Sequence, residues 1–251
     1  MATVIVSDDR SLGVGEARNQ LRRAVLRTEL RPGGLYSQDE IRKLLDVGRT
    51  PFREALRMVQ VEKLIEMLPN GRLRIPDLSL DDVTQVQIAR IALESAAMRA
   101  TIPALTPEDL AHLEGYMAQM SHYFSSDNFD RVETPHLDFH RTLLASAGPT
   151  LMSKIGELSD RFSRYRWAHA VQLRDAWPHR TSEHRAILDA AIAGDAEGAV
   201  AQMTRHYLEA GILLATFMQG PDGSGEPERF EEAILTSLAP SVRSAVDQLR
   251  F

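Results

Sequence analysis

The clearest pattern of apolar and polar positions in the chain lies between residues 49 and 59. Apolar residues recur there at spacings of three and four, which predicts a helix with one buried face. These residues are Phe52, Ala55, Leu56 and Val59. The opposite face carries Arg49, Thr50, Arg53 and Arg57. Thr50 is a suitable cap and Pro51 fits the first turn. The exposed arginines suit a groove lined by phosphates, because arginine donates in pairs to phosphates and to guanine edges.

A second short helix is expected immediately before this one, from Ser37 to Leu45. Ser37 and Glu40 have the spacing of a capping box. Residues 46–48 then form a tight connection, in which Gly48 can adopt a left-handed conformation. Two short helices joined in this way describe a helix-turn-helix. An ordinary helical hairpin with a solvated arginine face fits the local pattern equally well.

The flanking segments favour the helix-turn-helix. Residues 16–30 are predicted to form a helix that ends at a Pro-Gly-Gly turn. Residues 64–68 and 73–75 read as two strands around the Asn-Gly turn at 70–71. Three helices followed by a hairpin predict a winged helix-turn-helix in residues 1–76. The wing carries two basic residues, Arg72 and Arg74, as DNA binding would require.

The remainder of the chain is predicted to be helical, without a convincing strand. A short linker follows Ile75, and helical patterns then fill residues 79–219. Six helices are expected, at about 79–100, from 106 onward, and at 128–145, 149–171, 175–193 and 195–219. The predicted fold class is therefore mainly α, with an N-terminal winged helix-turn-helix followed by an all-α helical bundle. Residues 220–251 read as a flexible linker and a helical extension whose role the pattern does not define.

Composition and charge are consistent with two soluble units of different character. The chain has 251 residues, of which 43% are hydrophobic and 25% charged, and no cysteine. It contains no apolar run long enough to span a membrane and no signal peptide, so we expect a cytoplasmic protein. Residues 1–78 hold 14 basic and 11 acidic residues, whereas the remainder holds 15 and 24. A basic head on an acidic body is typical of a DNA-binding domain joined to another domain.

Four histidines stand on apolar stripes of three predicted helices. They are His136, His140, His184 and His206. The first two are four residues apart and share one helix face. Buried imidazoles are unfavourable unless they find partners, and one shared metal ion would supply a partner for all four. The alternative is that each histidine forms separate hydrogen bonds within the core.

Arg90 also lies on a face expected to be buried, in line with Val86, Leu93 and Ala97. It could clamp the carboxylate of a small acid ligand, or it could pair with Glu94 four residues on. Arg141 is a weaker candidate for the same effector role. A nucleophile elbow, a P-loop and a dinucleotide-binding glycine pattern are absent from the sequence. An enzyme reading would rest on a metal-activated water at the histidine cluster, as in a hydrolase.

Residues 35–75, and Arg49-Thr-Pro-Phe-Arg-Glu-Ala-Leu56 above all, resemble the N-terminal domain of the GntR family of bacterial transcription regulators. The resemblance implies that Arg49, Thr50 and Arg53 read an operator together with a glycine at the wing tip, here Gly71. We add Ser37, Arg57 and Arg72 as candidate DNA contacts. Gly48 and Lys63 depart from the usual pattern, and the wing reads Asn-Gly-Arg, which changes the setting of its minor-groove contact.

The bundle resembles the FCD domain of the FadR-type branch of that family. The matching segments include Phe139-His140, Glu183-His184-Arg185 and Arg205-His206, and with the head the resemblance covers about residues 14–219. Metal-binding members use three histidines and an acid, at positions matching His140, His184, His206 and, for the acid, His136. This chain therefore departs at one ligand, and a four-histidine set favours a divalent transition metal such as Zn or Ni.

These features together predict a cytoplasmic transcription regulator that is not an enzyme. We expect a homodimeric repressor that binds a pseudo-palindromic double-stranded DNA operator and responds to a small organic-acid effector. A metal-dependent hydrolase that uses the histidine cluster is the alternative from another class, and a structural metal module without an effector is a third.

Overall fold

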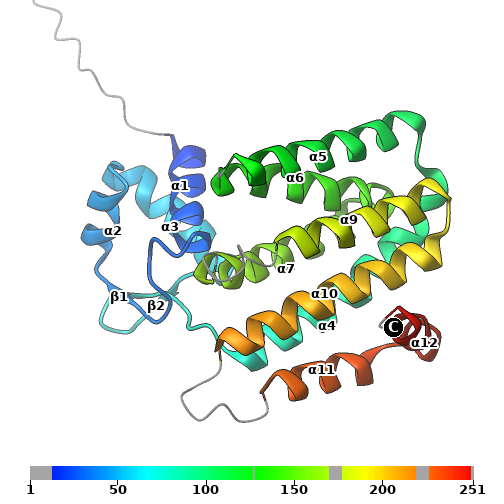
Figure 1. Ribbon diagram of the computed structural model, residues 1–251. Helices are drawn as coiled ribbons and strands as arrows, with labels where there is room; N and C mark the ends of the chain where they lie inside the picture. The colour runs from blue at the N-terminus through cyan, green and yellow to red at the C-terminus, as the bar shows by residue number, and fades with distance from the viewer. Residues whose placement is uncertain (1–12, 127, 170–176, 219–225, 250–251) are drawn as a thin grey trace, which may run out of the picture. The chain divides into compact units, whose positions relative to one another are not determined.

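The computed structural model describes residues 13–126, 128–169, 177–218 and 226–249 (Figure 1). The chain divides into two compact units, residues 1–78 and 79–251. In the residues described, the first unit combines three helices with a small sheet, and the second unit is helical. The expected class, a winged helix-turn-helix followed by a helical bundle, is confirmed.

The first unit is built on helices α1 (Val14–Leu26), α2 (Gln38–Leu44) and α3 (Arg49–Val61). Its wing consists of β2 (Glu66–Met67) and β3 (Leu73–Arg74). A strand that the sequence pattern did not predict, β1 (Leu35–Tyr36), completes an antiparallel sheet of order β1-β3-β2. The apolar face of α3 is buried as predicted and packs with α1 in the core of this unit.

The capping box of α2 forms as predicted. The Glu40 backbone N–H donates to Ser37 Oγ at 3.2 Å, and the Ser37 N–H donates to Glu40 Oε2 at 2.5 Å. The tip of the wing turns at Gly71, whose φ of 77° is the left-handed conformation that glycine adopts without steric cost. The Leu68 N–H closes this hairpin by donating to the Arg72 carbonyl at 2.8 Å.

Two local expectations at the start of α3 are wrong. Gly48, and not Thr50, is the N-cap residue, because the helix begins at Arg49 and places Thr50 inside its first turn. Gly48 has an extended backbone with φ −63°, and the left-handed residue of the connection is Asp46, with φ 49°. The side chain of Thr50 is therefore free of a capping role and remains exposed on the helix.

The described part of the second unit contains six long helices near the expected positions. They are α4 (Leu80–Thr101), α5 (Pro107–Ser125), α6 (Phe129–Thr142), α7 (Pro149–Ala168), α9 (Trp177–Ile192) and α10 (Ala196–Met218). Short 3-10 turns, η1 (Ile102–Ala104) and η2 (Ala145–Ala147), follow α4 and α6. Helix α10 packs against both α9 and α4, and α5 packs against α6 (Figure 1). The long helix α10 is thus the central element of the bundle.

Two further helices, α11 (Glu226–Ser237) and α12 (Pro240–Gln248), pack on α10, and α11 also contacts α4. The buried ring of Phe230 rests on Gly211, where a Cβ would lie 2.0 Å from the ring. Arg205 donates from Nη1 to the Leu249 carbonyl at 3.0 Å. The described part of the C-terminal extension is therefore an integral layer of the second unit. Among the described residues, none of the helices combines the length and apolar character needed to cross a membrane.

Candidate nucleic-acid interface and candidate metal centre

Helix α3 presents the arginine face that the sequence predicts. Arg49, Thr50, Arg53 and Arg57 are exposed, on the side opposite the buried Phe52 and Val59. Arg57 Nη1 forms an exposed ion pair with Glu54 Oε1 at 3.0 Å. Because exposed pairs contribute little, Arg57 can exchange this partner for a phosphate. The face can therefore supply several charge-assisted donors to a nucleic acid.

The wing and the start of α2 carry the other candidate DNA contacts of the first unit. Ser37 Oγ accepts the capping hydrogen bond and keeps its own proton for donation. Gly71 is exposed at the tip of the wing, and Arg72 donates from Nη2 to the Leu35 carbonyl at 2.8 Å. Arg74 pairs with Asp77. A phosphate contact by Arg72 therefore uses its other N–H groups or replaces the bond to Leu35.

In the second unit, the four predicted histidines come together in one buried cluster. His136 and His140 project from α6, His184 from α9 and His206 from α10, and each is at most 7% exposed. Their nearest ring centroids are 4.4 Å apart, between His184 and His206, and each ring offers a nitrogen within 4.8 Å of the others. Two nitrogens bound to one zinc ion lie at most about 4.2 Å apart, so the rings would have to move slightly closer together to share an ion.

Two of these rings have an oxygen atom at Nδ1. His206 Nδ1 lies 2.5 Å from Glu183 Oε2, and both side chains are buried. His140 Nδ1 lies 3.3 Å from the hydroxyl of Tyr207, which donates its own proton to Glu94. Histidines that bind metal through one nitrogen commonly donate from the other to such a partner. His140 Nε2 is buried and has no hydrogen-bond partner among the described residues.

The charge state of His140 suits a metal ligand. Burial lowers the pKa of His140 well below its usual range, and the neighbouring His184, His206, Arg90 and Arg166 lower it further. The ring is therefore neutral at neutral pH, and a neutral imidazole is the form that binds a metal ion. Burial likewise raises the pKa of Tyr207 well above its usual range, which keeps its hydroxyl protonated.

A small cavity adjoins the cluster. Its lining includes five cationic or imidazole side chains, and no carboxylate, among the described residues: Arg90, Arg166, His136, His140 and His206. The space open to the centre of a water molecule is about 20 Å³, which is enough for one water. Because these side chains carry positive charge or can donate hydrogen bonds, the lining favours the binding of an anion.

Arg90 lines this cavity and also pairs with Glu94. Its Nε lies 2.9 Å from Glu94 Oε1, Nη1 donates to Gln87 at 3.2 Å, and the guanidinium stacks 4.1 Å from the Tyr207 ring centroid. Burial alone would lower the pKa of Arg90, but Glu94 and Tyr207 outweigh it and raise that pKa. Arg90 can therefore pair with Glu94 and line a ligand site at the same time, so the two expectations for it are compatible.

Arg141 does not reach the cavity. Its side chain is 63% exposed and pairs with Asp138 Oδ1 at 3.3 Å. One residue after His140, it projects from a different face of α6, so the structure gives no support to its role as an effector contact.

Sequence reasoning missed several residues around the cluster, namely Glu183, Tyr207, Arg166 and Gln87. Glu183 and Tyr207 stand next to two of the histidines in the chain, and a polar neighbour of this kind was the available signal. Arg166 and Gln87 come from α7 and α4, and they meet the cluster only through tertiary packing.

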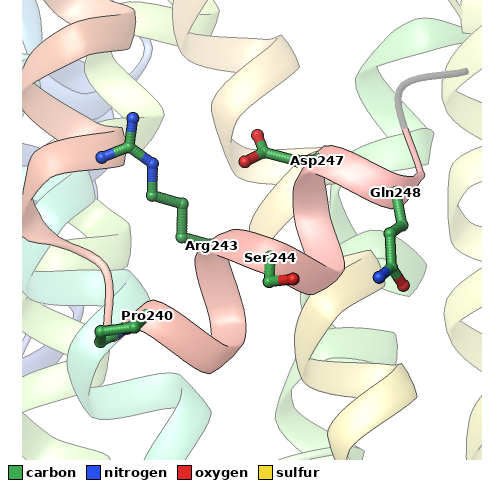
Figure 2. Close-up of a pocket in the computed structure, with 5 residues that line it drawn as sticks. All are labelled: Pro240, Arg243, Ser244, Asp247 and Gln248. Atoms are coloured by element: carbon green, nitrogen blue, oxygen red, sulfur yellow. The ribbon is translucent and has the colours of Figure 1, made fainter.

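A second hollow of the described structure lacks comparable chemistry. Figure 2 shows this hollow, on α12, lined by Pro240, Arg243, Ser244, Asp247 and Gln248. The labelled side chains point in different directions and do not converge on a shared point. This surface therefore offers no organised ligand set.

Fold and site together define a winged-helix regulator with a separate ligand-binding unit, and comparison with known families agrees. Residues 14–75 match the bacterial regulatory proteins of the gntR family, and residues 85–209 match the FCD domain. The chain belongs to the GntR family: it is a DNA-binding transcription regulator with a C-terminal effector-binding domain. It is not an enzyme, and nothing in these matches supports the hydrolase alternative.

Individual relatives point the same way. The chain is 25% identical over 222 residues to the uncharacterized HTH-type transcriptional regulator BphR of Paraburkholderia xenovorans, covering 84% of this chain and 88% of that protein. An uncharacterized HTH-type transcriptional regulator of Streptomyces ambofaciens is 28% identical over 194 residues, covering 74% and 78%. Escherichia coli McbR/YncC has the same fold, with a TM-score of 0.72, 19% identity and coverage of 82% and 98%.

The depressed pKa of His140 predicts a loss of stability in acid. Below about pH 6.5 the unfolded chain binds a proton at this histidine that the folded chain excludes. The free energy of unfolding therefore decreases as the pH is lowered, by up to about 1.4 kcal/mol per pH unit. In metal-free protein, His140→Gln should reduce this slope in urea melts between pH 7.5 and 5.5. The exposed His112→Gln is the control and should leave the slope unchanged. An equal slope in wild type and His140→Gln would contradict the assignment.

Proposed function

We propose that the protein is a homodimeric repressor that releases a pseudo-palindromic operator when a small carboxylate binds beside a metal ion in the second unit. The observation that carries this proposal is the cluster of four buried imidazoles beside a cavity that three of them line together with two guanidinium groups. That arrangement lies in the unit that the family uses for effectors.

The donor set fits a divalent transition metal, with Zn or Ni as the best candidates. Imidazole nitrogen is a ligand that these ions prefer, and the cluster supplies four such rings within reach of one ion: His136, His140, His184 and His206. The unpartnered Nε2 of buried His140 supports the assignment, since an ion would satisfy it. The metal's role would be to offer the effector's carboxylate a strong partner inside an apolar bundle.

The cavity supports a carboxylate as the effector class. Arg90 and Arg166 line the cavity, and their partners Glu94 and Glu133 lie outside its lining. An anion in the cavity would therefore gain charge-assisted hydrogen bonds from the two guanidinium groups. A metabolite is larger than the single water that the cavity accommodates. An effector would therefore bind a widened state of the bundle, and this differential affinity is what lets a ligand shift a conformational equilibrium.

The head supports a two-fold assembly on DNA. Helix α3 has 13 residues, a length of about 20 Å, so one copy reads a single short half-site. A symmetric dimer would place two such helices on a pseudo-palindrome. Since a bacterial regulator meets its operator in the cytoplasm, we infer a cytoplasmic protein.

Arg49→Ala tests the DNA face. A bidentate contact contributes about 1–3 kcal/mol, so operator binding should weaken about tenfold or more. Because Arg49 is exposed, the melting temperature should stay unchanged. Mobility-shift titration at fixed salt measures the affinity, with the exposed Arg243→Ala of α12 as a matched control that should bind normally. Wild-type affinity in Arg49→Ala would remove this face from the proposal.

Arg90→Lys tests the effector site. Lysine keeps a cation beside buried Glu94 but loses the planar fork that binds a carboxylate. With a panel of mono-, di- and hydroxycarboxylates, Zn-loaded wild type should release operator DNA in response to at least one. Arg90→Lys should bind DNA normally and need about tenfold more of that compound, as expected for one lost contact of about 1.4 kcal/mol. The exposed Arg141→Lys is the control, and an unchanged response in Arg90→Lys would contradict the role of Arg90.

A further inference from the structure

The histidines of the cluster differ in what their second nitrogen contacts. At His206, Nδ1 faces the Glu183 carboxylate, which only accepts, so Nδ1 carries the proton and Nε2 keeps its lone pair. At His140, the Tyr207 hydroxyl uses its proton to donate a hydrogen bond to Glu94, so it can only accept from Nδ1. Both rings therefore present an Nε2 lone pair, which is the form that ligates an ion.

His136 has the opposite arrangement. Its Nδ1 lies 3.0 Å from Nη1 of Arg166, and a guanidinium group only donates. Nδ1 must therefore be the acceptor, and the neutral ring then carries its proton on Nε2. A metal ion cannot bind a nitrogen that keeps its proton. His136 could ligate through Nε2 only after Arg166 withdrew and the proton moved to Nδ1.

Arg166 is held in this position by the same helix that carries His136. Its Nη2 donates to Glu133 Oε1 at 2.6 Å, and Glu133 stands one turn before His136 on α6. The side chains of Arg166 and Glu133 are 17% and 22% exposed. A charge-assisted pair of this burial is stronger than a surface pair and keeps the guanidinium against the imidazole.

We infer that His140, His184 and His206 form the permanent ligand set, and that Arg166 holds His136 off the ion as a conditional fourth ligand. This inference rests on the proposed metal site and divides its four histidines by role. The fourth coordination position is then left open. Around it, Arg166 and the Nε2–H of His136 are both donors, and both line the cavity.

The consequence is that Arg166 determines the coordination number of the ion. Four permanent imidazoles would saturate a tetrahedral site, whereas three leave a position for water or for a carboxylate oxygen. A carboxylate in that position could accept from Arg166 with its second oxygen. Arg166 would thus be a positioning residue that keeps the metal available to an acid.

The test is metal binding by the full chain, with Zn²⁺ affinity from chelator competition and Co²⁺ visible absorption as a report of coordination. His136→Ala should change the Zn²⁺ dissociation constant less than about threefold. His206→Ala should raise it by about a hundredfold or more, because loss of an outer-shell partner alone already costs about 10–100-fold. The Co²⁺ spectrum of His136→Ala should match that of wild type. Should His206→Ala fail to fold, His140→Ala replaces it in the comparison.

Arg166→Met supplies the second arm. Without the donor, His136 can join the ion, so Zn²⁺ affinity should rise about tenfold, near 1.4 kcal/mol, and the Co²⁺ bands should change. The gain should vanish in the Arg166→Met/His136→Ala double variant, and Arg166→Lys, which keeps a donor, should resemble wild type.

Two results would overturn parts of this account, and they are distinguishable. If His136→Ala weakens Zn²⁺ binding as much as His206→Ala, His136 is an ordinary ligand, and the inference is wrong while the metal site stands. If wild type binds neither Zn²⁺ nor Co²⁺, the proposed metal site itself is wrong.

Discussion

The second unit depends on how an apolar bundle accommodates polar side chains at its centre. Buried polar groups are tolerated only with partners, and here the partners form a connected network. Gln87 joins α4 to the backbone of α10, Arg90 pairs with Glu94, and Tyr207 links that pair to His140. Glu183 on α9 pairs with His206 on α10. The network aligns α4, α6, α9 and α10 around the cavity, and a network of this kind favours one arrangement of the core.

This organisation also explains why Arg90 satisfies two expectations at once. Removal of either partner of a buried ion pair leaves an uncompensated charge, which costs about 3–5 kcal/mol. Arg90 is therefore needed for the fold of the bundle whether or not a ligand is present. A ligand that contacts Arg90 acts on a group already coupled to Tyr207 and His140, so its binding would change the surroundings of the metal site as well.

The sequence was most informative where a local rule has few alternatives. The capping box at Ser37, the Asn-Gly turn at Gly71 and the buried face of α3 follow from local chemistry, and all three form as expected. The convergence of the four histidines followed from helical spacing together with a family resemblance.

Local sequence rules failed where contacts with other residues determine the conformation. Thr50 has no capping role because Gly48 caps the helix two residues earlier, and β1 exists only because β3 pairs with it. The distinction between His136 and the other histidines depends on Arg166, which lies 30 residues away in the chain. Spacing could not reveal that contact, because α6 and α7 must pack before the two side chains meet.

The central claim is that the buried histidines bind a metal ion, and X-ray absorption at the zinc edge of tag-free protein tests it most directly. The account predicts one zinc per chain with a first shell at about 2.0–2.1 Å and outer-shell scattering from at least three imidazole rings. Protein that retains no zinc after dialysis, or a shell of oxygen atoms without imidazole scattering, would contradict the account.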